Sequence, residues 1–173
     1  MIYKFKGVEP KIGAHNFIAD NATVIGDVVT EKDVSIWFSA VIRADLSRVY
    51  IGEKSNVQDN VTIHGDKGFD VVIGKNVTIG HNCLIHGCKI GDNCVIGMGS
   101  VLLDGAVIPN NSFIGANSLV TSSLVADEGY LILGAPAKAV KKLSERNATY
   151  LKNSSKFYVK EIDDYTNELE RIK

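Results

Sequence analysis

The sequence predicts an all-β solenoid, a parallel β-helix of six-residue repeats over residues 1–140, followed by an amphipathic α-helix over residues 141–173 that packs on it. Three observations support this prediction. An aliphatic residue recurs every six positions through much of residues 12–125, and a small residue stands four places after most of these. Beyond residue 140, apolar residues recur at spacings of three, four or seven. A period of six belongs neither to a helix nor to a single strand, whereas the second spacing is helical.

The N-terminal stretch MIYKFKG precedes the repeat and is expected to form a short covering strand. The aliphatic positions of the repeat are Ile18, Val24, Ile36, Ile42, Ile51, Val57, Ile63, Ile73, Ile79, Ile85, Ile90, Ile96, Leu102, Ile108, Ile114 and Val120. Each unit is a short strand and a turn, and three units close one triangular coil of about 18 residues. The aliphatic side chains point inward and stack between coils, while Gly and Asn at the corners tolerate a positive φ.

The small residues of the repeat also face inward, and two of the three cysteines belong to this set. Cys83 and Cys94 each follow an aliphatic position by four residues, so both are expected in the core. Cys88 lies where the period is interrupted, and the pattern makes no prediction for it. Three cysteines without a CxxC pair are typical of a reducing compartment.

This pattern resembles that of hexapeptide-repeat proteins, which fold as left-handed parallel β-helices. The resemblance implies left-handed winding, although parallel crossover connections are generally right-handed. The stretch GAPAKAV, residues 134–140, is similar to the ending of such repeats and is expected to close the solenoid.

The C-terminal segment carries the apolar stripe of an amphipathic helix. Its members are Ala148, Leu151, Tyr158, Ile162, Tyr165, Leu169 and Ile172. Ser144, followed by Glu145, is a suitable start for this helix. The stripe is expected to cover apolar surface along the β-helix or at a boundary between subunits.

The composition narrows the functional classes. The formal net charge is −1, with 45% hydrophobic and 23% charged residues, as in ordinary water-soluble domains. A near-neutral balance gives no reason to expect a nucleic acid or a membrane as partner. The first residues lack the apolar core of a signal peptide, and no stretch is long and apolar enough to span a bilayer. We therefore expect a cytoplasmic protein.

Two histidines occupy equivalent positions one coil apart. His64 follows Ile63 and His86 follows Ile85, so both point outward from the same side of the triangle. They are 22 residues apart because the stretch GDKGFDVV after His64 is four residues longer than a standard turn. Neighbouring coils lie about 4.8 Å apart, so both imidazoles can reach one metal ion through bonds of about 2.0–2.1 Å.

A third histidine belongs to another side of the triangle. His81 stands two residues after Ile79, near a corner, and points away from the column of His64 and His86. It can reach such a column only on a neighbouring subunit. The pattern therefore predicts a homotrimer with three metal sites at its interfaces, each taking two histidines from one chain and one from the next. The fourth histidine, His15, is expected to be an ordinary polar surface residue.

The stretches IRADL, SNVQDNVTIHG and IGHNCLIHGCKIG resemble those of the γ-class carbonic anhydrases and their shorter relatives, and the resemblance covers essentially the whole chain. It implies reversible hydration of CO2 to bicarbonate, with His64, His81 and His86 as the metal ligands. Zn²⁺ is the expected metal, and Fe²⁺ and Co²⁺ suit the same ligands.

The same resemblance implies roles for further residues. Gln58 orients the reacting solvent molecule and Asn56 supports it, while Tyr158 approaches the site from the C-terminal helix. Arg43 and Asp45 form a pair that helps fix the subunit interface. Asp59, one coil from His81 in the same outward column, suits a supporting or interface role.

The sequence departs from that of active γ-class carbonic anhydrases in two places, so alternative functions remain open. The loop after His64 is only GDKGFD, and Leu46 follows Asp45 where active relatives have an acidic residue, so Asp66 and Asp70 are the acids available to carry protons away. One alternative is a hexapeptide-repeat acyltransferase or acyl-CoA thioesterase, which binds acyl-CoA between subunits. The other is a metal-binding trimer with weak catalysis or none.

Overall fold

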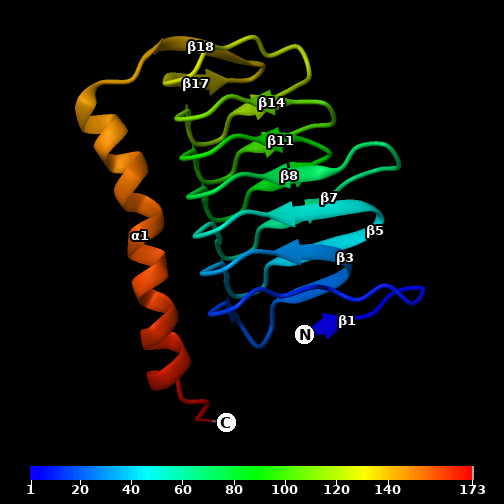
Figure 1. The fold of residues 1–173 in the computed structure, drawn as a ribbon. Helices are drawn as coiled ribbons and strands as arrows, with labels where there is room; N and C mark the ends of the chain where they lie inside the picture. The colour runs from blue at the N-terminus through cyan, green and yellow to red at the C-terminus, as the bar shows by residue number, and fades with distance from the viewer. Residues whose placement is uncertain (173) are drawn as a thin grey trace.

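The computed structural model describes residues 1–172, so Lys173, the last residue of the predicted helical segment, lies outside the described residues. The chain winds into a left-handed parallel β-helix whose coils stack along one axis, and a single helix, α1 (Glu145–Glu168), runs along its side (Figure 1). The fold class predicted from the six-residue repeat is confirmed. None of the helices formed by residues 1–172 has the length and apolarity of a membrane span.

The strands form two sheets. The ten-stranded sheet contains β1 (Ile2–Tyr3), β3 (Thr23–Thr30), β5 (Val41–Ile51), β7 (Thr62–His64), β8 (Val71–Ile73), β10 (Leu84–His86), β11 (Lys89–Ile90), β13 (Val101–Leu102), β14 (Val107–Ile108) and β16 (Leu119–Val120). The eight-stranded sheet contains β2 (Phe17–Ile18), β4 (Ser35–Ile36), β6 (Asn56–Val57), β9 (Thr78–Ile79), β12 (Val95–Ile96), β15 (Phe113–Ile114), β17 (Tyr130–Gly134) and β18 (Ala137–Lys142).

The long strands β3 and β5 explain why three sides of a triangle form two sheets. The first part of β5 pairs with β7 and its last part pairs with β8, so β5 turns the corner between two sides without a break. The third side is the eight-stranded sheet, where parallel pairing runs from β2 to β17. The last strand, β18, folds back antiparallel on β17 and ends the solenoid.

The core consists of the stacked aliphatic columns. Ile63 pairs with Ile85 and Ile85 with Leu102, and all three side chains are fully buried. Burial of one such side chain is worth about 1.5–3 kcal/mol, so each coil adds a similar increment along the stack. At the corners, Asn60, Asn82 and Asn93 adopt positive φ, a conformation that asparagine tolerates better than most residues.

All three cysteines are buried in this core. Cys88, for which the repeat made no prediction, is 0% exposed and faces inward like the other two. Burial raises the pKa of Cys83 to about 11 and those of Cys88 and Cys94 to about 12. The thiols therefore stay protonated near neutral pH and act as small core residues.

Helix α1 covers the outer face of the eight-stranded sheet. Ser144 caps its N-terminus by accepting a hydrogen bond from the backbone N–H of Asn147. Leu151, Ser155 and Ile162 are its buried residues. The prediction that the apolar stripe continues to Ile172 was wrong, because the helix ends at Glu168 and Ile172 is 92% exposed. Most helical stability comes from tertiary packing, and this side chain has no packing surface.

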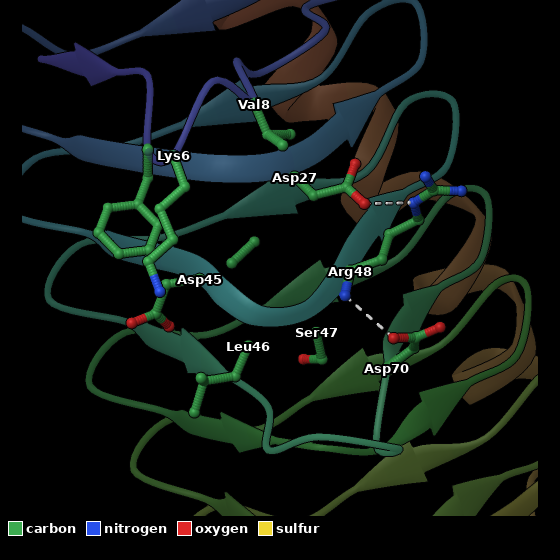
Figure 2. Close-up of a pocket in the computed structure, with 10 residues that line it drawn as sticks. Lys6, Val8, Asp27, Asp45, Leu46, Ser47, Arg48 and Asp70 are labelled. Atoms are coloured by element: carbon green, nitrogen blue, oxygen red, sulfur yellow. Dashed lines mark hydrogen bonds and ion pairs between the residues drawn. The ribbon is translucent and has the colours of Figure 1, made fainter.

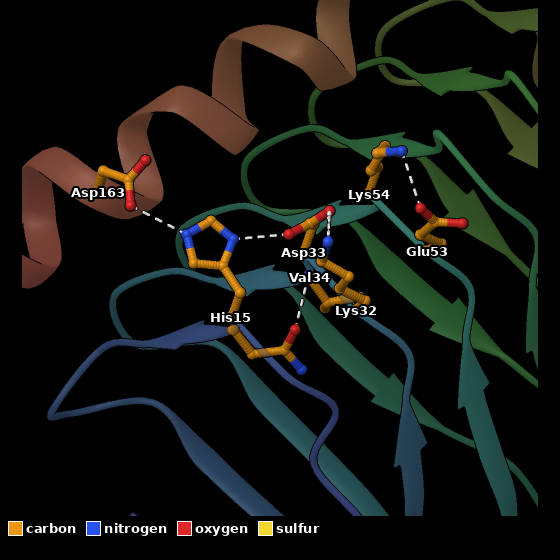
Figure 3. A network of polar contacts seen from close by, with 8 residues as sticks. His15, Lys32, Asp33, Val34, Glu53, Lys54 and Asp163 are labelled. Atoms are coloured by element: carbon orange, nitrogen blue, oxygen red, sulfur yellow. Dashed lines mark hydrogen bonds and ion pairs between the residues drawn. The ribbon is translucent and has the colours of Figure 1, made fainter.

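An aromatic cluster and an ion-pair network hold the lower part of α1. Trp37 lies 4.7 Å from Tyr165 and 5.6 Å from Tyr158, ring centre to ring centre. His15, expected to be an ordinary surface residue, lies between Asp33 of the solenoid (Nδ1–Oδ1 2.6 Å) and Asp163 of α1 (Nε2–Oδ1 2.9 Å; Figure 3). His15 therefore links the helix to the first coils.

Candidate metal centre

The two histidines of the predicted column lie side by side on the ten-stranded sheet. His86 at the end of β10 is in register with His64 at the end of β7, and His64 is in register with Arg43 of β5. The stacking of equivalent coil positions causes this alignment, as the repeat predicted. His64 Nδ1 lies 3.1 Å from His86 Nε2, so these two nitrogens, the inner pair, face one another.

Each outer nitrogen meets a carboxylate. His64 Nε2 lies 3.0 Å from Asp45 Oδ1, and His86 Nδ1 lies 2.7 Å from Asp104 Oδ1. Such carboxylate partners fix the tautomer and ring orientation of metal-binding histidines. The sequence reasoning missed Asp104, although it stands 18 residues after His86, about one coil further along the chain. We call His64, His86, Asp45 and Asp104 the two-histidine cluster.

The donor set of this cluster fits a metal ion. A neutral imidazole that donates N–H to a carboxylate from one nitrogen carries only a lone pair on the other. The inner nitrogens of His64 and His86 therefore direct lone pairs into the same space. Two nitrogen ligands of a tetrahedral metal, with bonds of about 2.0–2.1 Å, lie about 3.3 Å apart. Their separation of 3.1 Å is close to that value, so a divalent cation suits the position.

Arg43 and Asp45 form the predicted pair, in contact through Nη1 and Oδ2 at 2.5 Å. Burial of Asp45 opposes ionisation, but hydrogen bonds from Arg43 and His64 outweigh it and hold the pKa of the carboxyl below its ordinary value. Asp45 is thus an ionised acceptor for the His64 ring at neutral pH. Arg43 balances its charge.

A third potential ligand belongs to the loop after His64. Within residues 1–172, one group of three or more side chains could hold a metal, and it consists of His64, Asp66 and His86, with ligand atoms within 4.8 Å of one another. Asp66 is exposed. Asp70, the other acid named from the sequence, is placed elsewhere, where its Oδ1 accepts a hydrogen bond from the Arg48 backbone N–H at 2.9 Å.

A cavity of about 490 Å³ opens beside this cluster. Its lining residues are Phe5, Lys6, Val8, Asp27, Ala44, Asp45, Leu46, Ser47, Arg48 and Asp70. Figure 2 shows Asp45 at one side of the cavity and the Asp27–Arg48 ion pair, at 3.0 Å, at the other. The cavity gives water access to the carboxylate behind His64.

His81 lies on the other sheet. It follows β9 in the eight-stranded sheet, and it is not part of the three-residue group on the ten-stranded sheet. Its Nδ1 lies 2.8 Å from Asp59 Oδ2, one coil below, so Asp59 holds this ring as Asp45 holds His64. One chain therefore carries two separate groups of candidate functional side chains, on two sides of the triangle.

Gln58 and Asn56 belong to the same side as His81. Both flank Val57 of β6 and point outward beneath α1, where Asn56 is 1% and Gln58 5% exposed. Gln58 Nε2 donates to Asn56 Oδ1 at 3.4 Å, and Asn56 Nδ2 donates to Thr78 Oγ1 at 3.0 Å. We call Asn56, Gln58, Asp59 and His81 the His81 group.

Tyr158 reaches this side from α1. Its ring packs against Trp37 at 5.6 Å, and the side chain is half-buried. Burial raises the pKa of the Tyr158 hydroxyl, and the charge of Asp59 raises it further. The hydroxyl therefore stays protonated at neutral pH and can donate a hydrogen bond. Its contacts with Trp37 also give it a packing role.

Comparisons with known proteins identify the family to which the chain is related. Residues 70–104 and 87–122 match the family model described as bacterial transferase hexapeptide (six repeats). A carbonic anhydrase of Geobacillus kaustophilus is 41% identical over 165 residues, covering 95% of this chain and 91% of that protein. The mitochondrial gamma carbonic anhydrase 2 of Arabidopsis thaliana is 36% identical over 156 residues, covering 87% of this chain and 56% of that protein.

A solved structure has the same fold over nearly its whole length. It is a hexapeptide transferase family protein from Anaplasma phagocytophilum, with a TM-score of 0.91 and 40% identity, covering 95% of this chain and 97% of that one. At these identities and coverages, fold and family are shared. The chain belongs to the γ-class carbonic anhydrase-like family of hexapeptide-repeat proteins.

Proposed function

We propose that this protein catalyses the reversible hydration of carbon dioxide to bicarbonate, as a homotrimer with a metal site at each subunit interface. One observation carries the proposal: two histidines with facing ring nitrogens 3.1 Å apart, each held by a carboxylate. Ordinary surface histidines are rarely held in this way, whereas carboxylates behind the rings are usual at metal centres, where they fix the orientation and tautomer of the ligands. The carbonic anhydrase named among the relatives supports the same reaction.

The trimer supplies the missing ligand. His64 and His86 provide two nitrogens, and a tetrahedral catalytic site takes three protein ligands and leaves one position open. His81 cannot join them within the chain because it follows a strand of the other sheet. In a closed three-fold ring, the His81 group of one subunit faces the two-histidine cluster of the next. Val41 and Leu84, both partly exposed beside that cluster, add apolar surface to the interface.

Each residue then has a defined task. When bound, a divalent metal, Zn²⁺ or alternatively Fe²⁺ or Co²⁺, supplies the Lewis acidity that lowers the pKa of a water molecule to about 7. Asp45, Asp104 and Asp59 hold the three imidazoles in the ligating tautomer. Gln58 accepts a hydrogen bond from the reacting solvent and so directs its lone pair toward CO2. The Tyr158 hydroxyl donates a hydrogen bond at the rim of the site.

The test combines metal analysis with CO2 hydration on the same protein. Wild-type protein reconstituted with Zn²⁺, Co²⁺ or Fe²⁺ should bind about one metal per chain and hydrate CO2. His64→Ala, His81→Ala and His86→Ala should each abolish tight binding, because three ligands share the roughly 10–16 kcal/mol of a well-formed zinc site. His15→Ala should retain full metal content. Normal metal content in His81→Ala would contradict the shared site, and an inactive metal-loaded wild type would contradict the reaction.

A second candidate function is acyl transfer or acyl-CoA hydrolysis. The observation that favours it is the transferase naming of the matching family model and of the Anaplasma phagocytophilum structure. Such an enzyme requires acyl-CoA and not the three-histidine centre. Titration of acetyl-CoA into metal-free and metal-loaded protein separates the two functions. Acetyl-CoA consumption that survives chelation would favour the transferase, whereas full metal loading without either activity would indicate a metal-binding scaffold.

A further inference from the structure

We infer that Ser154 of helix α1, acting through Thr78 and Asn56, sets the orientation of the Gln58 amide. The inference rests on the proposed function for its catalytic consequence. Its structural part depends only on hydrogen bonds within one chain. Thr78 and Ser154 connect to Gln58 only through Asn56, so both act as positioning residues.

The contacts form one chain from the helix to Gln58. Ser154 Oγ lies 2.7 Å from Thr78 Oγ1, and Asn56 Nδ2 donates to the same Thr78 oxygen at 3.0 Å. Gln58 Nε2 then donates to Asn56 Oδ1 at 3.4 Å. Asn56, Gln58 and Thr78 are each 5% exposed or less, so water competes weakly for these groups.

The acceptors around Asn56 fix the orientation of its side-chain amide. Its Nδ2 faces two oxygens, Thr78 Oγ1 and, at 3.5 Å, the Val77 carbonyl. A flipped Asn56 amide would direct its own oxygen at that carbonyl, which is repulsive. Thr78 Oγ1 accepts from Asn56, and within the Thr78–Ser154 pair either hydroxyl can donate to the other.

The orientation of Asn56 in turn orients Gln58. Since Asn56 Oδ1 faces Gln58, the Gln58 side chain turns its amino group toward Asn56 and its oxygen away. None of the hydrogen bonds described for residues 1–172 engages that oxygen. Gln58 therefore presents an acceptor, as a residue that orients the proton of a reacting water or hydroxide must. A reversed amide would present a donor and turn the solvent lone pair away from CO2.

Side-chain amide NMR signals test the proposed hydrogen-bond chain from Ser154 to Gln58 without an activity measurement. In side-chain amide NMR spectra of the full-length protein, Thr78→Val and Ser154→Ala should shift the Asn56 and Gln58 resonances. Thr78→Ser, which keeps the hydroxyl, should leave both resonances at their wild-type positions. Ser155→Ala is the matched control, because Ser155 is the next residue of the helix and its buried hydroxyl has no partner. Unchanged Asn56 and Gln58 signals in Thr78→Val would overturn the inference.

Kinetics test the consequence for the proposed reaction. Thr78→Val should lower kcat for CO2 hydration about tenfold, with KM and metal content unchanged, and Ser154→Ala should lower it less. On a Gln58→Ala background, Thr78→Val should cause no further loss, because residues that act through one another are not additive. A Thr78→Val enzyme as fast as wild type, or losses that multiply with Gln58→Ala, would overturn the positioning role. A wild type without CO2 hydration would instead refute the proposed function, and the amide signals would still decide the structural part.

Discussion

His64 and His86 each use both ring nitrogens, one toward a carboxylate and one toward the other histidine. A ring held from behind keeps its lone pair aimed at one point without further adjustment, which lowers the cost of binding a metal. Asp45 holds the His64 ring and Asp104 holds the His86 ring in the same way. Asp45 is additionally neutralised by Arg43, whereas the described contacts give Asp104 no such cation.

Asp104→Asn should weaken metal binding about 10- to 100-fold, the usual effect of removing a carboxylate behind a metal-binding histidine. The amide retains the size of the side chain but removes the charge that holds the His86 proton on Nδ1. Competition with a chelator of known affinity measures the change. Asp127→Asn, at an exposed acid, is the control. Equal affinities for Asp104→Asn and wild type would show that the 2.7 Å contact does not support the site.

Gln58→Ala should leave metal content and assembly intact and slow CO2 hydration about 10- to 1000-fold, the scale of removing one positioned polar group from a transition state. Gln58→Glu should also slow the reaction, because its negative charge repels bicarbonate and disfavours ionisation of the nearby solvent. Stopped-flow rates at matched metal content test both variants. An active wild type matched in rate by Gln58→Ala would remove Gln58 from the mechanism.

At the residue level, the repeat predicted the register of side chains, such as His64 with His86, whereas their roles stay predictions. The distance from His64 to His86 follows from coil stacking, and the ion pair of Arg43 with Asp45 was expected. Asp104 was missed because its side chain reaches across to the neighbouring coil from a corner, and the repeat does not specify where corner side chains point. A search for acids about one coil from each histidine would have found it.

At the level of elements, the lower part of α1 is held to the solenoid by an aromatic cluster and an ion-pair network. The aromatic rings of Trp37 and Tyr165 pack in an edge-to-face arrangement that is worth about 0.5–1.5 kcal/mol beyond burial. The His15 network adds a charged link in which Asp33 is 8% and Asp163 68% exposed at the side chain. Lys32, 3.9 Å from Asp33, is the other cation of this group.

The charged link makes helix docking dependent on pH. The hydrogen bonds that the His15 ring donates to Asp163 and, second, to Asp33 raise the pKa of His15 above 6.5. A raised pKa in the folded state means that the stabilisation is complete below pH 6.5 and is lost as the pH rises through the raised value. Because Asp163 is exposed, the effect should be at most about 1 kcal/mol.

Thermal unfolding of wild type and His15→Asn from pH 5.5 to 8.5 measures this effect. The wild type should be more stable at the acidic end, and the difference should shrink above neutral pH. Hydrogen exchange of the α1 backbone should show the same trend. A difference that is constant across this range would mean that His15 stabilises the helix without its charge. Asp163→Asn should reduce the pH dependence in the same way.

At the scale of the whole molecule, the proposed site is divided over two sheets. The two-histidine cluster projects from the ten-stranded sheet and the His81 group from the eight-stranded sheet, so neither group completes a metal site alone. A rigid solenoid cannot bend one sheet toward the other. In the proposed trimer, assembly with a second copy brings the three imidazoles together.

Mixed trimers test this arrangement directly. His81→Ala and His64→Ala subunits each lack tight sites when alone. Co-expressed, they should regain metal and CO2 hydration, because an interface between an intact His81 group and an intact two-histidine cluster forms whenever the two variants are neighbours in the correct order. In random mixtures about one interface in four should be complete, since each neighbour is drawn independently from two kinds of subunit.

The control mixture combines His64→Ala with His86→Ala subunits. Both variants damage the same cluster, so none of its interfaces is complete and the mixture should remain without tight metal sites. Restoration in this control would mean that the ligands are not shared as proposed. Failure of the first mixture, with trimers confirmed by sedimentation, would place His81 outside the metal site.

The sequence by itself determined the β-helix, its inward columns and the separation of His81 from His64 and His86. A period of six allows one register for each coil, so the side chains that share a side can be counted. Only the tertiary structure decided which carboxylate supports each ring, where α1 ends and how Ser154 reaches Gln58. These contacts join residues far apart in the chain, such as His15 and Asp163, 148 positions apart. The packing of a helix against a solenoid, which no repeat encodes, brings such residues together.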